Sequence, residues 1–218
     1  ELLGRFEHIF VQDLSSLQLL EQVSIRRVSV SGDTRFDRVL EIASRAGVFP
    51  DIEKFTGGGR VLIAGSTWPE DERILATYCE EADELVQMII APHEIDEPHL
   101  RELERLFEGI TVRYSQLSAT DAITLAVKQV LIIDNFGMLS SLYRVGFAAF
   151  IGGGFERSGI HNILEAAVYG LPVFFGPNYE KFKEAGELMA RGGAFSVNDA
   201  REFEERLAAL KLPGAMEA

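Results

Sequence analysis

Short apolar runs alternate with amphipathic stretches along most of the chain. From Arg60 onward the apolar runs predict seven buried strands, at 60–65, 85–92, 109–115, 128–134, 148–153, 171–176 and 194–197. The stretches between them place apolar residues at helical spacing and predict helices at 69–82, 96–107, 137–144, 160–169, 179–190 and 199–210. Strands that are apolar throughout and alternate with helices are typical of βαβ units. The pattern therefore predicts an α/β fold, a Rossmann-like parallel sheet with helices on both faces.

The first part of the chain repeats this pattern in a shorter form. It predicts two strands and two helices, at 8–13, 26–32, 14–22 and 36–47. Residues 48–60 contain Pro50 and three glycines and have no periodicity, which predicts a linker.

Composition and charge narrow the classes of partner. Lys and Arg number 21 against 34 Asp and Glu, a net charge of −13, which argues against nucleic acid because phosphate backbones need a basic surface. One small phosphate ligand stays compatible with this charge. Cys79, the only cysteine, is expected to be a core residue. A single cysteine allows no disulfide within the chain, which predicts a reducing compartment. No apolar stretch reaches the roughly 18 residues of a membrane span, so we expect a soluble chain.

Polar and glycine-rich segments follow several predicted strands. Parallel sheets bind ligands beyond the carboxyl ends of their strands, where these segments lie. They read GSTWPEDE (65–72), APHEID (91–96), DNFGMLSSLY (134–143) and GGGFERSGIHNILE (152–165). Each alone is compatible with a turn and a helix cap. Together, at one edge of the sheet, they predict a ligand site.

The segment at 152–165 combines groups that suit a nucleotide. Its three leading glycines let the backbone turn sharply and let a ligand approach closely. A helix starting near Gly159–His161 would offer free N–H groups and its positive dipole end to a phosphate. His161 and Asn162 add side-chain donors, and Glu165 could accept two hydrogen bonds from a ribose diol. The alternative is a glycine-rich turn with a core histidine.

Several single residues have more than one interpretation. His93 fits a site or a turn equally, whereas His8 and His99 fit structural or solvated positions. Trp68 precedes a proline and a helix and is expected to be a packing residue. Arg35 and Arg157 are candidates to meet a carboxylate or phosphate of a ligand.

The segment GGGFERSGIHNILEAAVYGLPVFFGPNYEKFKEA (152–185) resembles the C-terminal half of a known family. These are the Kdo transferases, GT-B glycosyltransferases with two Rossmann-like lobes, which move 3-deoxy-D-manno-octulosonic acid (Kdo) from CMP-Kdo to lipid A precursors. The segments GDTRFDRV (32–39), PHE (92–94) and GMLSSLY (137–143) are similar to that family as well, as is GSTWPEDE. The resemblance covers essentially the whole chain, in the family's order.

The resemblance implies a role for residues in the polar segments that follow the strands, which we call corners. The CMP phosphate would lie at Gly159, Ile160, His161 and Asn162, and the ribose at Glu165. The leaving phosphate would be bordered by Gly65, Ser66 and Thr67, and the nucleotide by Pro92, His93 and Glu94. The family carries Glu where this chain has Met138, so Met138, its neighbour Gly137 and Arg35 are further candidate contacts. Asp134 and Asn135 are expected to compensate for the absent Glu, or Met138 to use its backbone.

The resemblance also implies a division of the chain. Residues 1–31 would be a remnant of the N-terminal acceptor lobe, 32–59 a helix and linker, and 60–218 the nucleotide-sugar donor-binding domain. The family's catalytic base, acceptor groove and membrane anchor belong to the N-terminal lobe, so no catalytic residue is expected here. We therefore expect the donor-binding half of an enzyme of lipopolysaccharide core biosynthesis, which works at the cytoplasmic face of the bacterial inner membrane, and expect this piece alone to be inactive.

Cofactors and partners follow from the same resemblance. No D-x-D motif is present, so we expect no metal and no cofactor beyond the donor substrate CMP-Kdo. The lipid A precursor and the membrane would be contacted only through the N-terminal lobe. The apolar residues of 1–31 would pack on the main domain or form a homodimer. Two alternatives stay open: a GT-B domain for another nucleotide sugar, and a non-catalytic nucleotide-binding module.

Overall fold

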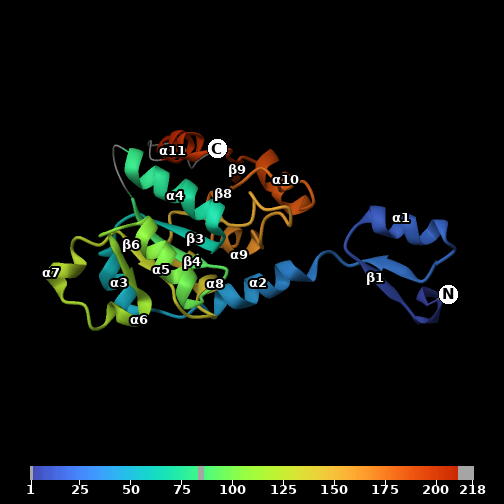
Figure 1. The fold of residues 1–218 in the computed structure, drawn as a ribbon. Helices are drawn as coiled ribbons and strands as arrows, with labels where there is room; N and C mark the ends of the chain where they lie inside the picture. Colours follow the sequence, from blue (N-terminus) through green and yellow to red (C-terminus); the bar gives the residue numbers. More distant parts are fainter. Residues whose placement is uncertain (1, 83–85, 211–218) are drawn as a thin grey trace. The chain divides into compact units, whose positions relative to one another are not determined.

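The computed structural model describes residues 2–82 and 86–210, which form two compact units, Glu1–Arg45 and Ala46–Ala218 (Figure 1). Leu85, the predicted first residue of a strand, and residues 211–218, the predicted end of the domain, lie outside the described residues.

The first unit is a single βαβ arrangement with an additional helix. Its elements are η1 (Leu3–Arg5), β1 (Ile9–Val11), α1 (Leu14–Gln22), β2 (Val28–Val30) and α2 (Thr34–Ser44). β1 and β2 pair in parallel, with Ile9 opposite Val28. Asp13 and Asp33 each begin a helix, because their side chains accept a hydrogen bond from a first-turn amide.

The second unit is built on a seven-stranded parallel sheet in the order β5-β6-β4-β3-β7-β8-β9. Its strands are β3 (Val61–Thr67), β4 (Gln87–Pro92), β5 (Thr111–Arg113), β6 (Val130–Ile132), β7 (Ala148–Ile151), β8 (Val173–Phe175) and β9 (Ala194–Ser196). Each coincides with a predicted strand, so the predicted α/β class and parallel sheet are confirmed. The five inner strands are buried on both faces, which is why their sequences are apolar without alternation, whereas the edge strands β5 and β9 are partly buried.

Helices flank this sheet. The longer ones are α4 (Pro69–Glu81), α5 (Glu97–Leu106), α10 (Lys183–Ala190) and α11 (Ala200–Ala209). Figure 1 shows α11, in red, beside α4, and Phe203 of α11 explains the contact. Its ring meets Tyr78 of α4, Phe150 of β7 and Phe174 of β8 edge-on, with ring centroids 5.2–5.5 Å apart.

Short helices account for the differences from the predicted elements. The predicted linker at 48–60 contains α3 (Pro50–Thr56), which begins at a proline and ends at Gly57 in a left-handed conformation. Ile52 and Phe55 of α3 are buried, but seven residues are too few to show a helical period. The structure also contains α6 (Tyr114–Leu117), α7 (Ala122–Leu125), α8 (Leu139–Leu142), η2 (Tyr143–Val145) and α9 (Leu164–Ala167).

Candidate functional site

The chain reverses its direction across the sheet between β3 and β7. From β3 it proceeds to β4 on one side, and from β7 to β8 on the other. At this point the Gly152 amide donates to the Gly65 carbonyl at 2.9 Å. A Cβ atom on Gly152 would lie 2.1 Å from the Ser66 carbonyl oxygen, so only glycine fits. The corners after β3 and β7 therefore touch at the place where open α/β sheets bind ligands.

The β3 corner has an unusual backbone. Ser66 adopts a φ of +54°, in the left-handed region that few residues other than glycine occupy. The register of β3 against β4 shifts between Gly65 and Thr67 at the same point. A Cβ atom on Gly65 would lie 2.1 Å from the Tyr143 hydroxyl, which burial keeps protonated by raising its pKa. Strained backbone of this kind concentrates at functional sites.

Three rings from three corners form one cluster. The Trp68 and His93 centroids lie 4.5 Å apart and the His93 and His161 centroids 4.6 Å apart, with both pairs stacked. Trp68 and His161 are nearly coplanar, at 9°, and Trp68 Nε1 donates to His161 Nε2 at 2.9 Å. His93 thus stacks on a flat surface made by the other two rings. Trp68, expected to be a packing residue, is part of the predicted site.

This hydrogen bond determines the protonation of His161. An indole nitrogen only donates, so His161 Nε2 must be the unprotonated nitrogen and Nδ1 carries the proton. Burial lowers the pKa of His161 below its ordinary value, and the charge of His93 lowers this pKa further. His161 is therefore a neutral ring that can donate from Nδ1 alone.

Two buried carboxylates in the first turn of α4 connect the corners. Asp71 Oδ2 accepts hydrogen bonds from the Trp68 amide at 2.9 Å and the Gly153 amide at 2.8 Å. Its Oδ1 is buried and has no hydrogen-bond partner among the described residues. Burial raises the pKa of Asp71 to about 6, and the charges of Glu72 and Glu156 add to this rise. Asp71 therefore connects the β3 and β7 corners.

Glu72 connects the β3 corner to α5. Its Oε1 accepts a hydrogen bond from the Thr67 hydroxyl at 2.9 Å, and His99 Nε2 lies 3.0 Å from both carboxylate oxygens. His99 is thus structural, one of the two expectations for it. The burial of Asp71 and Glu72 could not be predicted from the sequence, because acids in a first helical turn usually face solvent.

The corner after β7 differs from its prediction. A helix was expected to start near Gly159–His161, but α9 begins at Leu164, so that part of the prediction was wrong. The Ile160 amide donates to the Asn178 carbonyl at 3.3 Å, and the His161 amide to the Gly152 carbonyl at 3.0 Å. These two bonds keep residues 160 and 161 outside the helix.

The free amides therefore lie later in the chain than expected. Asn162 Oδ1 accepts a hydrogen bond from the amide of Leu164, the first residue of α9, at 3.1 Å. Among the described residues, no partner accepts a hydrogen bond from the amide of Asn162 or Ile163. Asn162 Nδ2 donates to Glu165 Oε1 at 3.1 Å, which orients the half-buried Glu165 carboxylate at this corner.

The corner after β4 contributes three residues in different environments. Pro92 is buried at the end of β4, whereas His93 and Glu94 are exposed. The His93 amide donates to the Thr67 carbonyl at 2.9 Å, which fixes this corner against the β3 corner.

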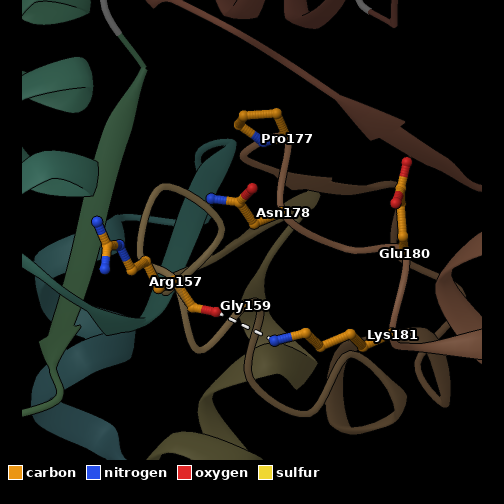
Figure 2. Close-up of a pocket in the computed structure, with 6 residues that line it drawn as sticks. All are labelled: Arg157, Gly159, Pro177, Asn178, Glu180 and Lys181. Carbon is orange, nitrogen blue, oxygen red and sulfur yellow. Dashed lines mark hydrogen bonds between the residues drawn. The ribbon is translucent and has the colours of Figure 1, made fainter.

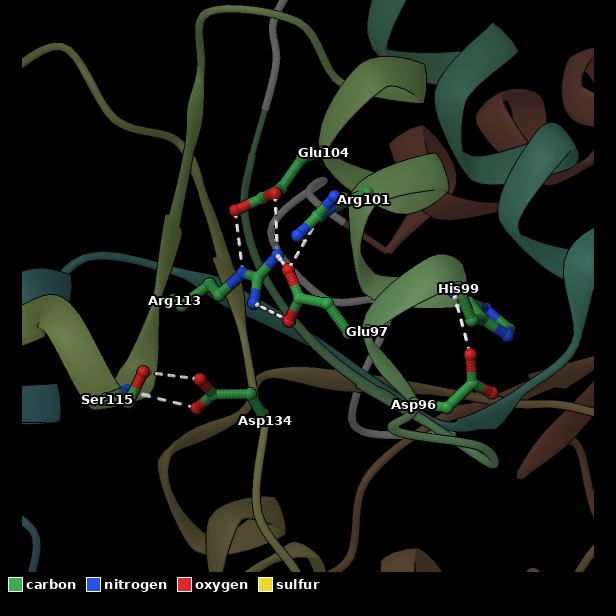
Figure 3. Close-up of polar contacts among 8 residues, drawn as sticks. All are labelled: Asp96, Glu97, His99, Arg101, Glu104, Arg113, Ser115 and Asp134. Carbon is green, nitrogen blue, oxygen red and sulfur yellow. Dashed lines mark hydrogen bonds and ion pairs between the residues drawn. The ribbon is translucent and has the colours of Figure 1, made fainter.

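Ion pairs hold α5 against the neighbouring strand β5 (Figure 3). Arg113 Nε lies 2.7 Å from Glu104 Oε1, and Arg113 also lies 2.8 Å from Glu97 Oε2. Hydrogen bonds from Arg113, and then from Arg101, lower the pKa of Glu97 to about 2.

The candidate contacts around Met138, where the family carries Glu, are poorly placed to bind a ligand through their side chains. Met138 is buried at the start of α8, so it offers only its backbone, and Gly137 precedes it with a φ of +90°. Figure 3 shows the Asp134 carboxylate turned toward Ser115, whose amide donates to it at 3.0 Å. Arg35 lies in the first unit and pairs with Asp33 at 2.6 Å.

A cavity of about 410 Å³ adjoins the β7 corner (Figure 2). It is lined by Arg157, Gly159, Pro177, Asn178, Glu180 and Lys181. These residues come from the loops that follow β7 and β8.

Metal and membrane features are absent from the described residues. Within 2–82 and 86–210, no group of three or more His, Cys, Asp and Glu residues is placed to hold a metal ion. In the same residues no helix has both the length and the apolar character needed to cross a bilayer.

Comparison with known proteins shows which proteins this chain resembles. No family model matches the chain. It is 28% identical over 156 residues to the 3-deoxy-D-manno-octulosonic acid transferase of Aquifex aeolicus, covering 70% of this chain and 42% of the relative. The transferase of Chlamydophila psittaci is 31% identical over 135 residues, covering 62% of this chain and 30% of the relative. The chain thus spans less than half the length of these curated relatives.

A solved structure gives the same result. The C-terminal CMP-Kdo binding domain of WaaA from Acinetobacter baumannii matches with a TM-score of 0.62 and 25% identity, covering 83% of this chain and 93% of that domain. The resemblance to the C-terminal half of the Kdo transferases, expected from the segment at 152–185, is confirmed by these matches.

Proposed function

We propose that this chain binds CMP-Kdo as the donor-binding half of a Kdo transferase in lipopolysaccharide core biosynthesis. The observation that carries the proposal is the junction of three corners at the reversal point of the sheet, in a fold that matches nearly all of a solved CMP-Kdo binding domain. The domain spans residues 60–218 in this proposal, after a remnant of the acceptor lobe at 1–31 and a helix and linker at 32–59.

The CMP phosphate binds at the β7 corner. The amides of Asn162 and Ile163 have no partner among the described residues and can donate to phosphate oxygens. His161 donates from Nδ1, the nitrogen left protonated by its bond to Trp68. These donors are fixed in place before the ligand arrives, so they stabilise the charge that develops on the leaving phosphate.

The nucleoside is held by the neighbouring groups. Glu165, oriented by Asn162, accepts hydrogen bonds from the ribose diol. Pro92, His93 and Glu94 line the nucleotide, and the exposed His93 ring offers a face for stacking. Gly65, Ser66 and Thr67 border the leaving phosphate.

The rest of the reaction is assigned to the acceptor lobe. Transfer needs a base to deprotonate the acceptor hydroxyl, and we place this base, the lipid A precursor and the membrane contact in that lobe. The enzyme would work at the cytoplasmic face of the bacterial inner membrane, and this chain alone would transfer nothing. The acceptor lobe, or a second copy of the chain, would cover the apolar residues of 1–31.

Binding of CMP tests the proposal. Calorimetric titration should show CMP binding more tightly than cytidine, UMP or AMP, because both the phosphate and the cytosine are recognised. Glu165→Ala should weaken CMP and cytidine alike by about 1–3 kcal/mol, the range for hydrogen bonds to a charged group. Glu187→Ala, an exposed carboxylate of α10, is the matched control and should change neither.

Three outcomes would contradict the proposal. Equal affinity for CMP and cytidine would remove the phosphate role of the β7 corner. Equal affinity for UMP would favour a domain for another nucleotide sugar. Tight CMP binding without transfer of Kdo from CMP-Kdo, even when an acceptor lobe is joined to the chain, would favour a non-catalytic nucleotide-binding module.

A further inference from the structure

The cavity beside the β7 corner has walls that are held by the protein itself. The Asn178 amide donates to the Gly154 carbonyl at 2.8 Å, and the Asn178 side chain donates to the Glu156 carbonyl at 3.1 Å. The Ile160 amide donates back to the Asn178 carbonyl at 3.3 Å. A Cβ atom on Gly159 would lie 2.6 Å from the Phe182 ring, so the two loops pack closely. The cavity is therefore preformed.

Two cations line this cavity. Lys181 Nζ donates to the Arg157 carbonyl at 3.3 Å, a neutral partner. Among the ion pairs of the described residues, none involves Arg157 or Lys181. Glu180 also lines the cavity, but Figure 2 shows its carboxylate directed away from the Lys181 ammonium. Both cations line one preformed cavity, and no carboxylate among the described residues neutralises either of them, so an anionic ligand in the cavity could pair with both.

We propose that this cavity binds the carboxylate of the sugar acid in the donor, through Arg157 and Lys181. The inference rests on the proposed function and adds a second anion subsite to it. In a 2-ulosonic acid such as Kdo, the carboxylate and the phosphate are bonded to the same anomeric carbon. The two anions must therefore occupy neighbouring places. The cavity meets this requirement, because Gly159 in its wall lies two residues before His161 of the phosphate corner.

The chemistry suits a carboxylate. A guanidinium can bind both carboxylate oxygens, and an ammonium adds a third donor from another direction. A nucleotide sugar without a carboxylate would leave both cations facing an uncharged group, at a cost in affinity. The cavity would therefore select sugar acids over neutral sugars, independently of the base.

Paired titrations test the inference. Arg157→Gln is the cleanest variant, because no interaction of the Arg157 guanidinium is found among the described residues. It should weaken CMP-Kdo by about tenfold or more, as expected for a lost charge-assisted hydrogen bond, and change CMP by less than about twofold. Lys181→Gln should act in the same direction, and Lys181→Arg, which keeps the charge, should restore most of the affinity. Arg191→Gln removes an exposed cation at the end of α10 and should change neither ligand.

Each other outcome has a distinct meaning. An equal loss of CMP and CMP-Kdo in Arg157→Gln would show that the cavity holds the phosphate and would overturn the carboxylate assignment. Unchanged CMP-Kdo affinity in both Arg157→Gln and Lys181→Gln would also overturn it, while leaving the proposed function standing. If the unsubstituted chain bound neither ligand, the proposed function would fail and the inference with it. Melting temperatures without ligand check that each variant is folded.

Discussion

Both units of this chain contain a strand–helix–strand arrangement, but only the second unit buries its strands in a core. In the second unit the five inner strands are buried, and three aromatic rings meet the ring of Phe203. In residues 2–45, all of them described, only Val39 is buried, and Phe10 of β1 is 68% exposed.

The difference lies in the number of neighbouring strands. A parallel strand is apolar on both faces because helices normally cover both. Two strands and one helix cannot cover each other, and isolated two-stranded sheets are marginal. Similar local sequence therefore gives a core in one unit and an exposed apolar surface in the other.

Truncating one phenylalanine in each unit gives the largest expected contrast. Phe203→Ala removes a fully buried ring and should lower the free energy of unfolding by about 3–5 kcal/mol. Phe10→Ala removes an exposed ring and should change the free energy by less than about 0.5 kcal/mol. Denaturant titration of both variants measures this. Comparable losses would break the comparison, because Phe10 would then be buried in solution.

The acids of the two units should respond to pH in opposite directions. The pKa of Asp71 rises from 3.8 to about 6, so its native form binds a proton where its unfolded form does not. Its contribution to stability therefore falls as the pH rises from about 4 to about 6. Relative to Asp71→Asn, the unsubstituted chain should lose about 3 kcal/mol across this window.

Asp33 supplies the opposite case. Its hydrogen bond from Arg35 lowers its pKa, so its stabilising contribution is present above pH 3.8 and is lost as the pH falls through the native pKa. The comparison with Asp33→Asn should show a small effect of this sign, because its partner Arg35 is exposed to solvent, which screens the pair. Denaturant titrations between pH 3 and 7 check both acids. A stability difference for Asp71→Asn that did not depend on pH would show that the carboxyl is not buried in solution.

Removal of the first unit should have the smallest effect on the site. Residues 46–218 contain the complete seven-stranded sheet and every candidate contact except Arg35. We expect this shorter chain to melt as cooperatively as the longer one and to bind CMP within about a factor of two, which is about 0.4 kcal/mol. A much larger loss of affinity would show that the first unit, and Arg35 in particular, contributes to the site.

The apolar runs and glycine-rich segments of the sequence were sufficient to predict the strands, the parallel sheet and the corners that follow the strands. Apolar runs such as those predicted at 60–65 and 148–153 indicate burial on both faces, which is a local property of an inner parallel strand. The glycines at 152–154 predicted a sharp turn, because glycine itself permits the backbone angles that such a turn needs. The resemblance to the Kdo transferases could also be recognised from the sequence, because one continuous segment, 152–185, carries it.

The polar groups that meet at the site could not be predicted from the sequence. The bond from Gly153 to Asp71 spans 82 residues, and the bond from Trp68 to His161 spans 93. No local pattern distinguishes a buried first-turn acid from an exposed one, because the distant partner makes the difference. The late start of α9 has the same cause, since the carbonyls of Gly152 and Asn178 take the amides that a helix would have left free. Hydrogen bonds to distant parts of the chain outweighed the local helical preference and thereby set the geometry of the site.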